Sequence, residues 1–141
     1  MNSLSRLILR LPRVYQALAF LLARRAVVRG PSMCPTLAPG EYVLFDRLAY
    51  RRGPPRRGDV VLASHPQRAG TRIIKRIAGA PGERVTVGER TWRLGEGEWL
   101  LLGDAPDFST DGRDFGPVGR ESIHARAWFV YWPPRRMRRV R

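Results

Sequence analysis

The hydrophobic pattern changes at Val27, and this change constrains the fold more than any other feature of the sequence. From that residue onward, apolar and polar residues alternate with a period of two, in short runs separated by Gly- and Pro-rich turns. Such alternation is typical of β-strands with one buried face. The runs are EYVLFDRL, GDVVLASHP, TRIIKRIAG, ERVTVGERTWRL, EWLLLG and HARAWFVYW. We therefore expect an all-β fold of about six to eight strands, mainly an antiparallel β sandwich or partly open barrel, with an N-terminal amphipathic helix.

The segment before Val27 has helical spacing instead. Apolar residues recur at this spacing from Leu4 to Leu22, and arginines lie between them. The longest uncharged run covers ten residues, 14–23, whereas a bilayer span needs roughly 20 apolar residues. Pro12 also interrupts or kinks the helix. We expect residues 1–26 to form a basic amphipathic helix in the lipid headgroup layer, and packing on the protein's own core is the alternative.

The net charge of +14 predicts an anionic partner, either phospholipid headgroups or nucleic acid. Basic residues are concentrated near the two ends of the chain, and we expect the Arg-rich tail 134–141 to be disordered. Residues 27–133 then form the single β domain. A basic nucleic-acid-binding β-barrel is one interpretation of this charge, because the last strand carries aromatic residues suited to stacking on bases. These aromatic residues are Trp128, Phe129, Tyr131 and Trp132.

Ser32 lies between a Gly-Pro turn and a Met-x-Pro turn, in the stretch VRGPSMCPTL. A serine hydroxyl is a weak nucleophile at neutral pH and needs a general base. The two histidines, His65 and His124, have no acidic residue at a spacing that suggests a triad. Lys75 is the only lysine among the basic residues. A desolvated lysine can lose its proton, whereas arginine stays charged in proteins, so Lys75 is a candidate base.

Strand alternation places Lys75 on the same face as Ile73 and Ile77. If this face is buried, the ammonium loses hydration and its pKa falls. Ile74 and Arg76 occupy the opposite face, so the sequence leaves the orientation of the strand open.

Four segments in this order resemble the type I signal peptidase family: GPSMCPTLAPGEYVLFDRL, RRGDVVLASHP, IIKRIAGAPGERV and LLGDAPDFSTDGRDFGPV. The short length is similar to that of the mitochondrial inner-membrane proteases and the nickel-type superoxide dismutase maturation proteases. The resemblance implies a serine endopeptidase with a Ser/Lys dyad, in which Ser32 is the nucleophile and Lys75 the general base. Its substrate would be a precursor protein with an N-terminal leader or signal peptide. A dedicated maturation protease for nickel-type superoxide dismutase is an alternative within this class.

The resemblance also implies roles for the loop around Ser109. Ser109 would orient Lys75 through a hydrogen bond, and Asp111 and Arg113 would form a structural ion pair. Many bacterial members carry a serine where this chain has Gly30, so the oxyanion hole would depend on backbone donors of the Gly30–Ser32 region, the Ser32 N–H included.

Substrate pockets, metals and location complete the expectations. Met33 and the apolar residues of EYVLF would line shallow pockets for small side chains. No metal or organic cofactor is expected. The loop also matches the opening of a calcium-binding EF-hand, with Asp107, Ser109 and Asp111, but its twelfth position is Val118 instead of glutamate.

We expect a membrane-associated protein, held by an interfacial helix or a single N-terminal anchor, that binds an anionic membrane surface and no specific nucleic acid. The side of the membrane is left open, the cytoplasmic face included.

Overall fold

The computed structural model describes residues 12–141, and these residues fold mainly into antiparallel β-strands. The strands are β1 (Arg24–Val27), β2 (Tyr42–Asp46), β3 (Val60–Ser64), β4 (Arg72–Gly79), β5 (Arg84–Val87), β6 (Arg90–Arg93), β7 (Glu98–Leu102), β8 (Val118–Gly119), β9 (Ile123–Trp132) and β10 (Arg138–Arg139). The helices are α2 (Pro12–Leu21) and α3 (Gly112–Phe115), with short 3-10 helices η1 (Ala49–Arg51), η2 (Pro106–Phe108), η3 (Arg120–Ser122) and η4 (Pro134–Arg136).

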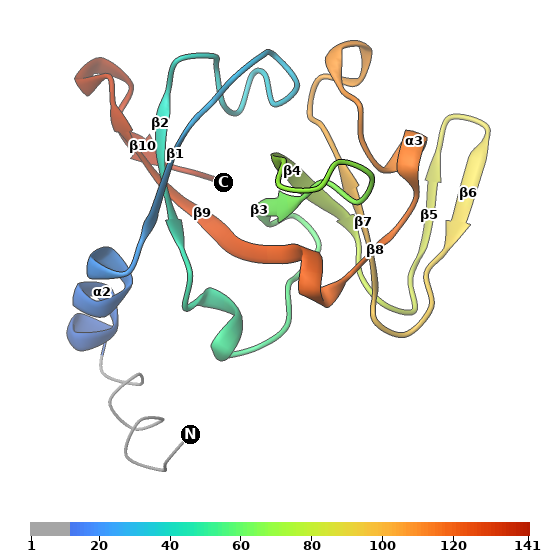
Figure 1. Cartoon of the computed structure of the whole chain (residues 1–141), viewed down its shortest axis with the longest axis horizontal. Helices are drawn as coiled ribbons and strands as arrows, with labels where there is room; N and C mark the ends of the chain where they lie inside the picture. Colours follow the sequence, from blue (N-terminus) through green and yellow to red (C-terminus); the bar gives the residue numbers. More distant parts are fainter. Residues whose placement is uncertain (1–11) are drawn as a thin grey trace.

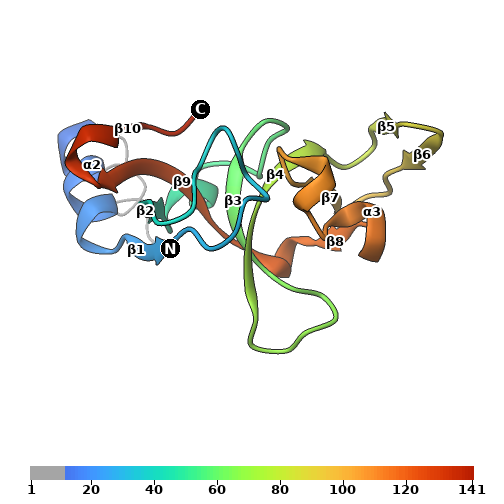
Figure 2. The ribbon, with the colours of Figure 1, turned by 90° about the horizontal axis from the view of Figure 1, so that it is seen from above.

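Eight of the strands form one sheet in the order β1-β2-β9-β3-β4-β7-β8, with β10 paired to β9. The β5–β6 hairpin forms a second, two-stranded sheet. This hairpin and helix α2 lie at opposite ends of the molecule (Figure 1), and the connection between β3 and β4 projects from one side (Figure 2). The expected all-β fold with an N-terminal helix is confirmed, and the sheet is not closed into a barrel.

Strand β9 joins the two halves of the sheet. Its ten residues pair with β2 along one edge and with β3 along the other. Register shifts interrupt both pairings, and such irregularities bend and twist a strand. The bend separates two groups of buried side chains, one around Phe45 and Val130 and the other around Ile77 and Leu101. The side chains of the candidate site lie beside these two core clusters.

The predicted helix of residues 1–26 is wrong at its C-terminal end. Helix α2 ends at Leu21, and residues 24–27 form strand β1, which pairs with β2 along its whole length. Pairing satisfies the backbone groups at the edge of β2, and this gain overrides the helical spacing of the side chains. Residues 1–11 of the predicted helix lie outside the described part of the chain. Within residues 12–141, no helix is both long enough and apolar enough to cross a membrane.

The predicted disorder of residues 134–141 is also wrong. This segment forms η4 and then β10, which pairs with β9. The Arg138 guanidinium donates to both carboxylate oxygens of Glu41, at 2.9 Å each. Glu41 is only 2% exposed, and a buried carboxylate is costly without a charged partner. The arginine therefore fixes the tail against the domain.

Candidate active site

The loop that carries Ser32 is held by its apolar and backbone contacts. Met33 and Leu37 are buried, and the Leu37 N–H donates to the Met33 carbonyl at 2.9 Å. Gly30 has φ +74°, a left-handed conformation that favours glycine and turns the chain into the loop. The Ala105 N–H donates to the Ser32 carbonyl at 2.9 Å. The position of Ser32 is thus fixed from the loop itself and from the chain that follows β7.

Lys75 is buried on the inner face of β4, which decides the orientation of this strand that the sequence left open. Its side chain is 4% exposed, and Ile77 on the same face is fully buried. The ammonium Nζ donates to Ser109 Oγ at 3.0 Å. Desolvation by burial lowers the pKa of Lys75 below the ordinary value of a lysine, although the negative charge of Asp111 acts in the opposite direction. Burial therefore favours the neutral amine that a general base requires.

The segment from Ser109 to Arg113 forms a continuous hydrogen-bonded chain behind Lys75. Ser109 Oγ donates to Asp111 Oδ2 at 2.7 Å. Arg113 donates to both oxygens of Asp111, from Nη2 at 2.7 Å and from Nε at 3.0 Å. Burial alone raises the pKa of the Asp111 carboxyl, but hydrogen bonds from Arg113, Gly103 and Ser109 hold it below its usual range. The structure thus brings together the residues that the sequence analysis assigned to this support.

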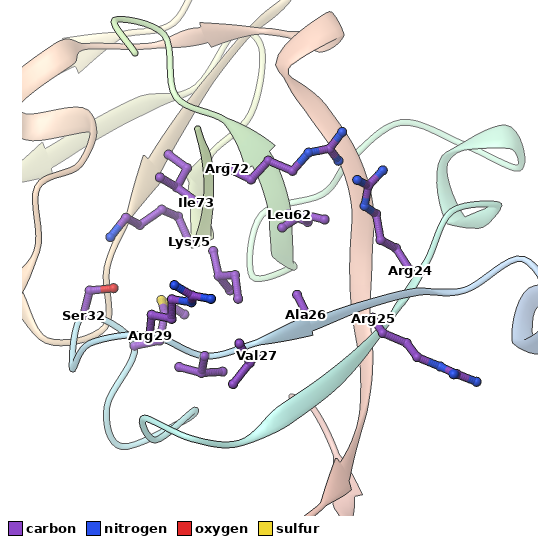
Figure 3. A pocket seen from close by; sticks show the side chains of 13 residues that line it. Arg24, Arg25, Ala26, Val27, Arg29, Ser32, Leu62, Arg72, Ile73 and Lys75 are labelled. Atoms are coloured by element: carbon purple, nitrogen blue, oxygen red, sulfur yellow. The ribbon is translucent and has the colours of Figure 1, made fainter. Parts of the chain in front are cut away.

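Ser32 and Lys75 line the same cleft, of about 540 Å³, which runs between β1 and β4. Figure 3 shows both side chains at one end of this cleft. The Lys75 ammonium donates to Ser109, and no direct hydrogen bond joins it to Ser32 among the described residues. Catalytic hydrogen bonds are often long in structures without substrate, so this geometry is compatible with a nucleophile and its base.

The predicted substrate pockets are only partly correct. Met33 lines the cleft, but Val43 and Phe45 of the EYVLF segment are fully buried in the core. These two side chains belong to a buried core cluster with residues of β3 and β9, where a substrate side chain has no access. The apolar part of the cleft wall comes from β1, β3 and β4 instead, through Ala26, Val27, Val28, Leu62, Ile73 and Ile74.

Two supporting features were not found by sequence reasoning. The first is Gly103, because a Cβ on this residue would lie 2.2 Å from Ser109 Oγ and 2.7 Å from the Ser32 carbonyl oxygen. Atoms do not approach so closely, so only glycine allows the Ser32 loop and Ser109 to converge here. Nothing in the sequence around Gly103 signals this convergence, which joins segments far apart along the chain.

The second missed feature is an ion pair on the outer face of β4. Arg76 donates to Asp104 from Nε at 2.8 Å and from Nη2 at 2.7 Å. Thr36, four residues after Ser32, donates to the same carboxylate at 2.5 Å. These contacts tie β4, the nucleophile loop and the chain after β7 to one another. The pairing of Arg76 also explains why the opposite face of β4 carries a charged residue.

The histidines and the calcium motif play no part in this arrangement. His124 Nε2 lies 2.5 Å from Ser64 Oγ, and His65 Nδ1 accepts from the Gln67 N–H at 3.1 Å. Neither contact involves Ser32. The Asp111 carboxylate, which the calcium reading requires as a ligand, is already used by Arg113, Ser109 and the Gly103 N–H.

Comparison with known proteins identifies the family. Residues 2–94 and 86–132 match the family described as "Signal peptidase, peptidase S26". The chain is 36% identical to mitochondrial inner membrane protease subunit 2 of Danio rerio, over 84% of this chain and 69% of that protein. It is 38% identical to mitochondrial ATP-independent inner membrane protease subunit 1a of Arabidopsis thaliana, over 76% and 69%. It is also 30% identical to signal peptidase I of Leptolyngbya laminosa, over 82% and 72%.

The chain belongs to the signal peptidase family, peptidase S26. It is a serine endopeptidase that removes the signal peptide from precursor proteins. The predicted family, enzyme class and activity are confirmed. These relatives give no support to a nickel-type superoxide dismutase maturation protease or to a nucleic-acid-binding β-barrel. Membrane association fits the mitochondrial inner membrane relatives.

Proposed function

We propose that Ser32 is the nucleophile and Lys75 the general base of this peptidase. The observation that carries the assignment is the burial of the only lysine of the chain, with a lowered pKa, in the cleft that Ser32 also lines. The histidines do not offer an alternative base, because their polar contacts are with Ser64 and Gln67.

The reaction then has two stages. Neutral Lys75 takes the proton of Ser32 while Oγ attacks the scissile carbonyl, and the resulting ammonium protonates the leaving amine. The peptide bond breaks and an ester to Ser32 remains. Lys75, neutral again, takes a proton from the water that attacks the ester. The lysine ammonium returns this proton to Ser32 Oγ as the ester bond breaks, and the product leaves as a carboxylic acid that ionises in water. Ser109 acts as a positioning residue, because its hydroxyl accepts from Lys75 and donates to Asp111.

Backbone groups near Gly30 and Ser32 are our candidates for the oxyanion hole. No backbone carbonyl within residues 12–141 accepts the Ser32 N–H, which leaves this donor available to substrate. The Ser32 carbonyl accepts from the Ala105 N–H at 2.9 Å, and this contact restrains the backbone of Ser32 before substrate binds. Gly30 leaves open space beside the loop, where a side chain would otherwise project.

Acylation of Ser32 by an activated peptide ester tests the dyad directly. The adduct should map to Ser32 by mass spectrometry after acid quenching. Its rate of formation should rise with pH, because attack requires neutral Lys75, and the midpoint of this rise should lie below the ordinary pKa of a lysine. Ser109 and Ser64 are internal controls and should stay unlabelled. Labelling of another serine, or a rate that does not change with pH, would contradict the assignment.

We further propose that the N-terminal segment holds the domain at an anionic membrane surface. One face of α2 packs on the domain through the buried Ala19 and through Tyr15, whose hydroxyl donates to Asp46. Apolar residues of α2 are exposed elsewhere, mainly Phe20 and Leu21, with Leu21 the most exposed at 75%. Arg24 and Arg25 begin strand β1, shortly after the helix, and are exposed. An exposed apolar surface beside arginines is typical of interfacial helices.

Replacing Phe20, Leu21 and Leu22 together by serine should release the intact protein from anionic vesicles in a co-flotation assay. High salt should also weaken binding by the wild type, since each arginine contributes about 1 kcal/mol near anionic lipid. Met137→Ser is the matched control, because Met137 is comparably exposed but follows η4, away from α2 (Figure 1). Binding that is unchanged in the triple variant would overturn the interfacial role of α2.

A further inference from the structure

The end of the cleft remote from Ser32 is lined by arginines. Arg24 at the start of β1 and Arg72 at the start of β4 both belong to the cleft wall. Figure 3 shows their guanidinium groups pointing toward each other across this end, while Ser32 and Lys75 lie at the other. Like charges repel at such a position, so their convergence needs an explanation.

Within residues 12–141, no carboxylate forms an ion pair with either of these two arginines. The ion pairs within residues 12–141 use other arginines, and residues 1–11 contain no acidic residue. Arg72 loses some hydration and also feels the charges of Arg24 and Arg47, and both effects lower the pKa of its guanidinium. Arg76, on the same strand, differs because Asp104 neutralises it. The remote end of the cleft therefore carries positive charge that an anionic group would stabilise.

The separation between Arg72 and Lys75 along β4 determines which part of a bound substrate would lie near the two arginines. Arg72 precedes Lys75 by three residues, which corresponds to about 10 Å along a strand. A peptide that lies extended in the cleft, with its scissile bond at Ser32, would place a side chain near Arg72 about three to five residues from that bond.

We propose that Arg24 and Arg72 form a specificity subsite for an acidic side chain of the precursor, about three to five residues from the scissile bond. This inference rests on the proposed function, since it takes Ser32 as the point of cleavage. A carboxylate would accept charge-assisted hydrogen bonds from both guanidinium groups and relieve their repulsion. A peptide is the favoured occupant over a phospholipid headgroup, because the arginines line the cleft that the peptide must occupy during cleavage.

The test uses intact protein and a series of peptides that differ only by one glutamate in place of glutamine, moved through every position around the scissile bond. At one position within the stated range, glutamate should raise kcat/KM about tenfold over glutamine, as one charge-assisted contact can. Arg72→Glu should reverse the preference there toward lysine, and Arg72→Gln should abolish it. Arg84→Glu is the control, because Arg84 is an exposed arginine on the distant β5–β6 hairpin and should leave the preference intact.

The outcomes separate this inference from the proposed function. Cleavage of the all-glutamine peptide depends only on Ser32 and Lys75. If this peptide is not cleaved, the result counts against the proposed function alone. An equal gain from glutamate at every position would show attraction by the net charge and overturn the subsite. A preference that survives Arg72→Glu, with vesicle binding lost instead, would assign these arginines to lipid headgroups and overturn it as well.

His124 gives an independent readout of an occupied subsite. Burial lowers the pKa of His124, and the positive charges of Arg72 and Arg24 lower it further. A glutamate peptide bound to inactive Ser32→Ala protein should therefore raise this pKa in an NMR titration, whereas the matched glutamine peptide should not. The chain has two histidines, so His65 is the internal reference. A pKa of His124 that is unmoved by saturating glutamate peptide would contradict the subsite.

Discussion

Replacing Lys75 by arginine should lower peptidase activity by on the order of 10³-fold or more, because arginine keeps the charge but cannot accept the proton of Ser32. The site of Lys75 is closed, with 4% of the residue exposed, so a bulkier guanidinium could also disturb packing. Lys75→Met avoids this problem, since it removes the amine and retains a side chain of similar length. Both variants should be inactive, and Lys75→Met should melt at or above the wild-type temperature, since it removes a buried charge.

The measurement is cleavage of a precursor or peptide, followed by sequencing of the new N-termini, with a thermal melt of each variant. Ser32→Ala should be as inactive as either lysine variant, and the double variant little worse, because the two residues act as one unit. Arg84→Met, which removes an exposed positive charge at a distance from the cleft, controls for net charge. A folded Lys75→Arg protein with nearly wild-type turnover would rule out Lys75 as the base.

The strands, and the strand face that Lys75 shares with its apolar neighbours, could be predicted because their signals are local. The period-two alternation along β4 predicted that Lys75 lies on the same face as Ile73 and Ile77, and this face is buried in the structure. The sequence left open which face is buried, because each face carries one basic residue, Lys75 on one and Arg76 on the other. Its partner Asp104 lies far along the chain, just after β7, so no local pattern could show that Arg76 is paired.

The features that sequence reasoning missed depend on contacts between distant segments. Strand β1 has no clear alternation, and the free edge of β2 decides its conformation. The tail looks disordered when only its charges are counted, yet one buried glutamate in another loop fixes it. The requirement for Gly103 arises only when Ser32 and Ser109 meet beside it.

Asp111→Asn should destabilise the protein by roughly 3 kcal/mol at neutral pH, the low end expected for breaking a buried ion pair. The Asp111 carboxylate is fully buried, whereas the Arg113 side chain is 24% exposed, so water can hydrate part of the unpaired guanidinium.

Ser109→Ala should behave differently. It removes one hydrogen bond on each side of Ser109 and should cost about 1 kcal/mol, but it frees the Lys75 ammonium from its acceptor. Its main effect should therefore be a fall in kcat.

The pH dependence of stability distinguishes a structural carboxylate from one that serves only in turnover. The folded protein holds the pKa of Asp111 below its usual range. The stabilisation is therefore fully present above the unfolded-state pKa, about 3.9, and is lost as the pH falls through the folded value. Denaturant unfolding from neutral to acidic pH should show a smaller loss in Asp111→Asn than in the wild type. Ser109→Ala should lie between the two, because Arg113 and the Gly103 N–H still donate to Asp111 and still lower its pKa. If Ser109→Ala melts early and its folded fraction keeps full kcat, Ser109 supports the loop without orienting Lys75. Equal acid sensitivity of Asp111→Asn and the wild type would show that another carboxylate carries the acid transition.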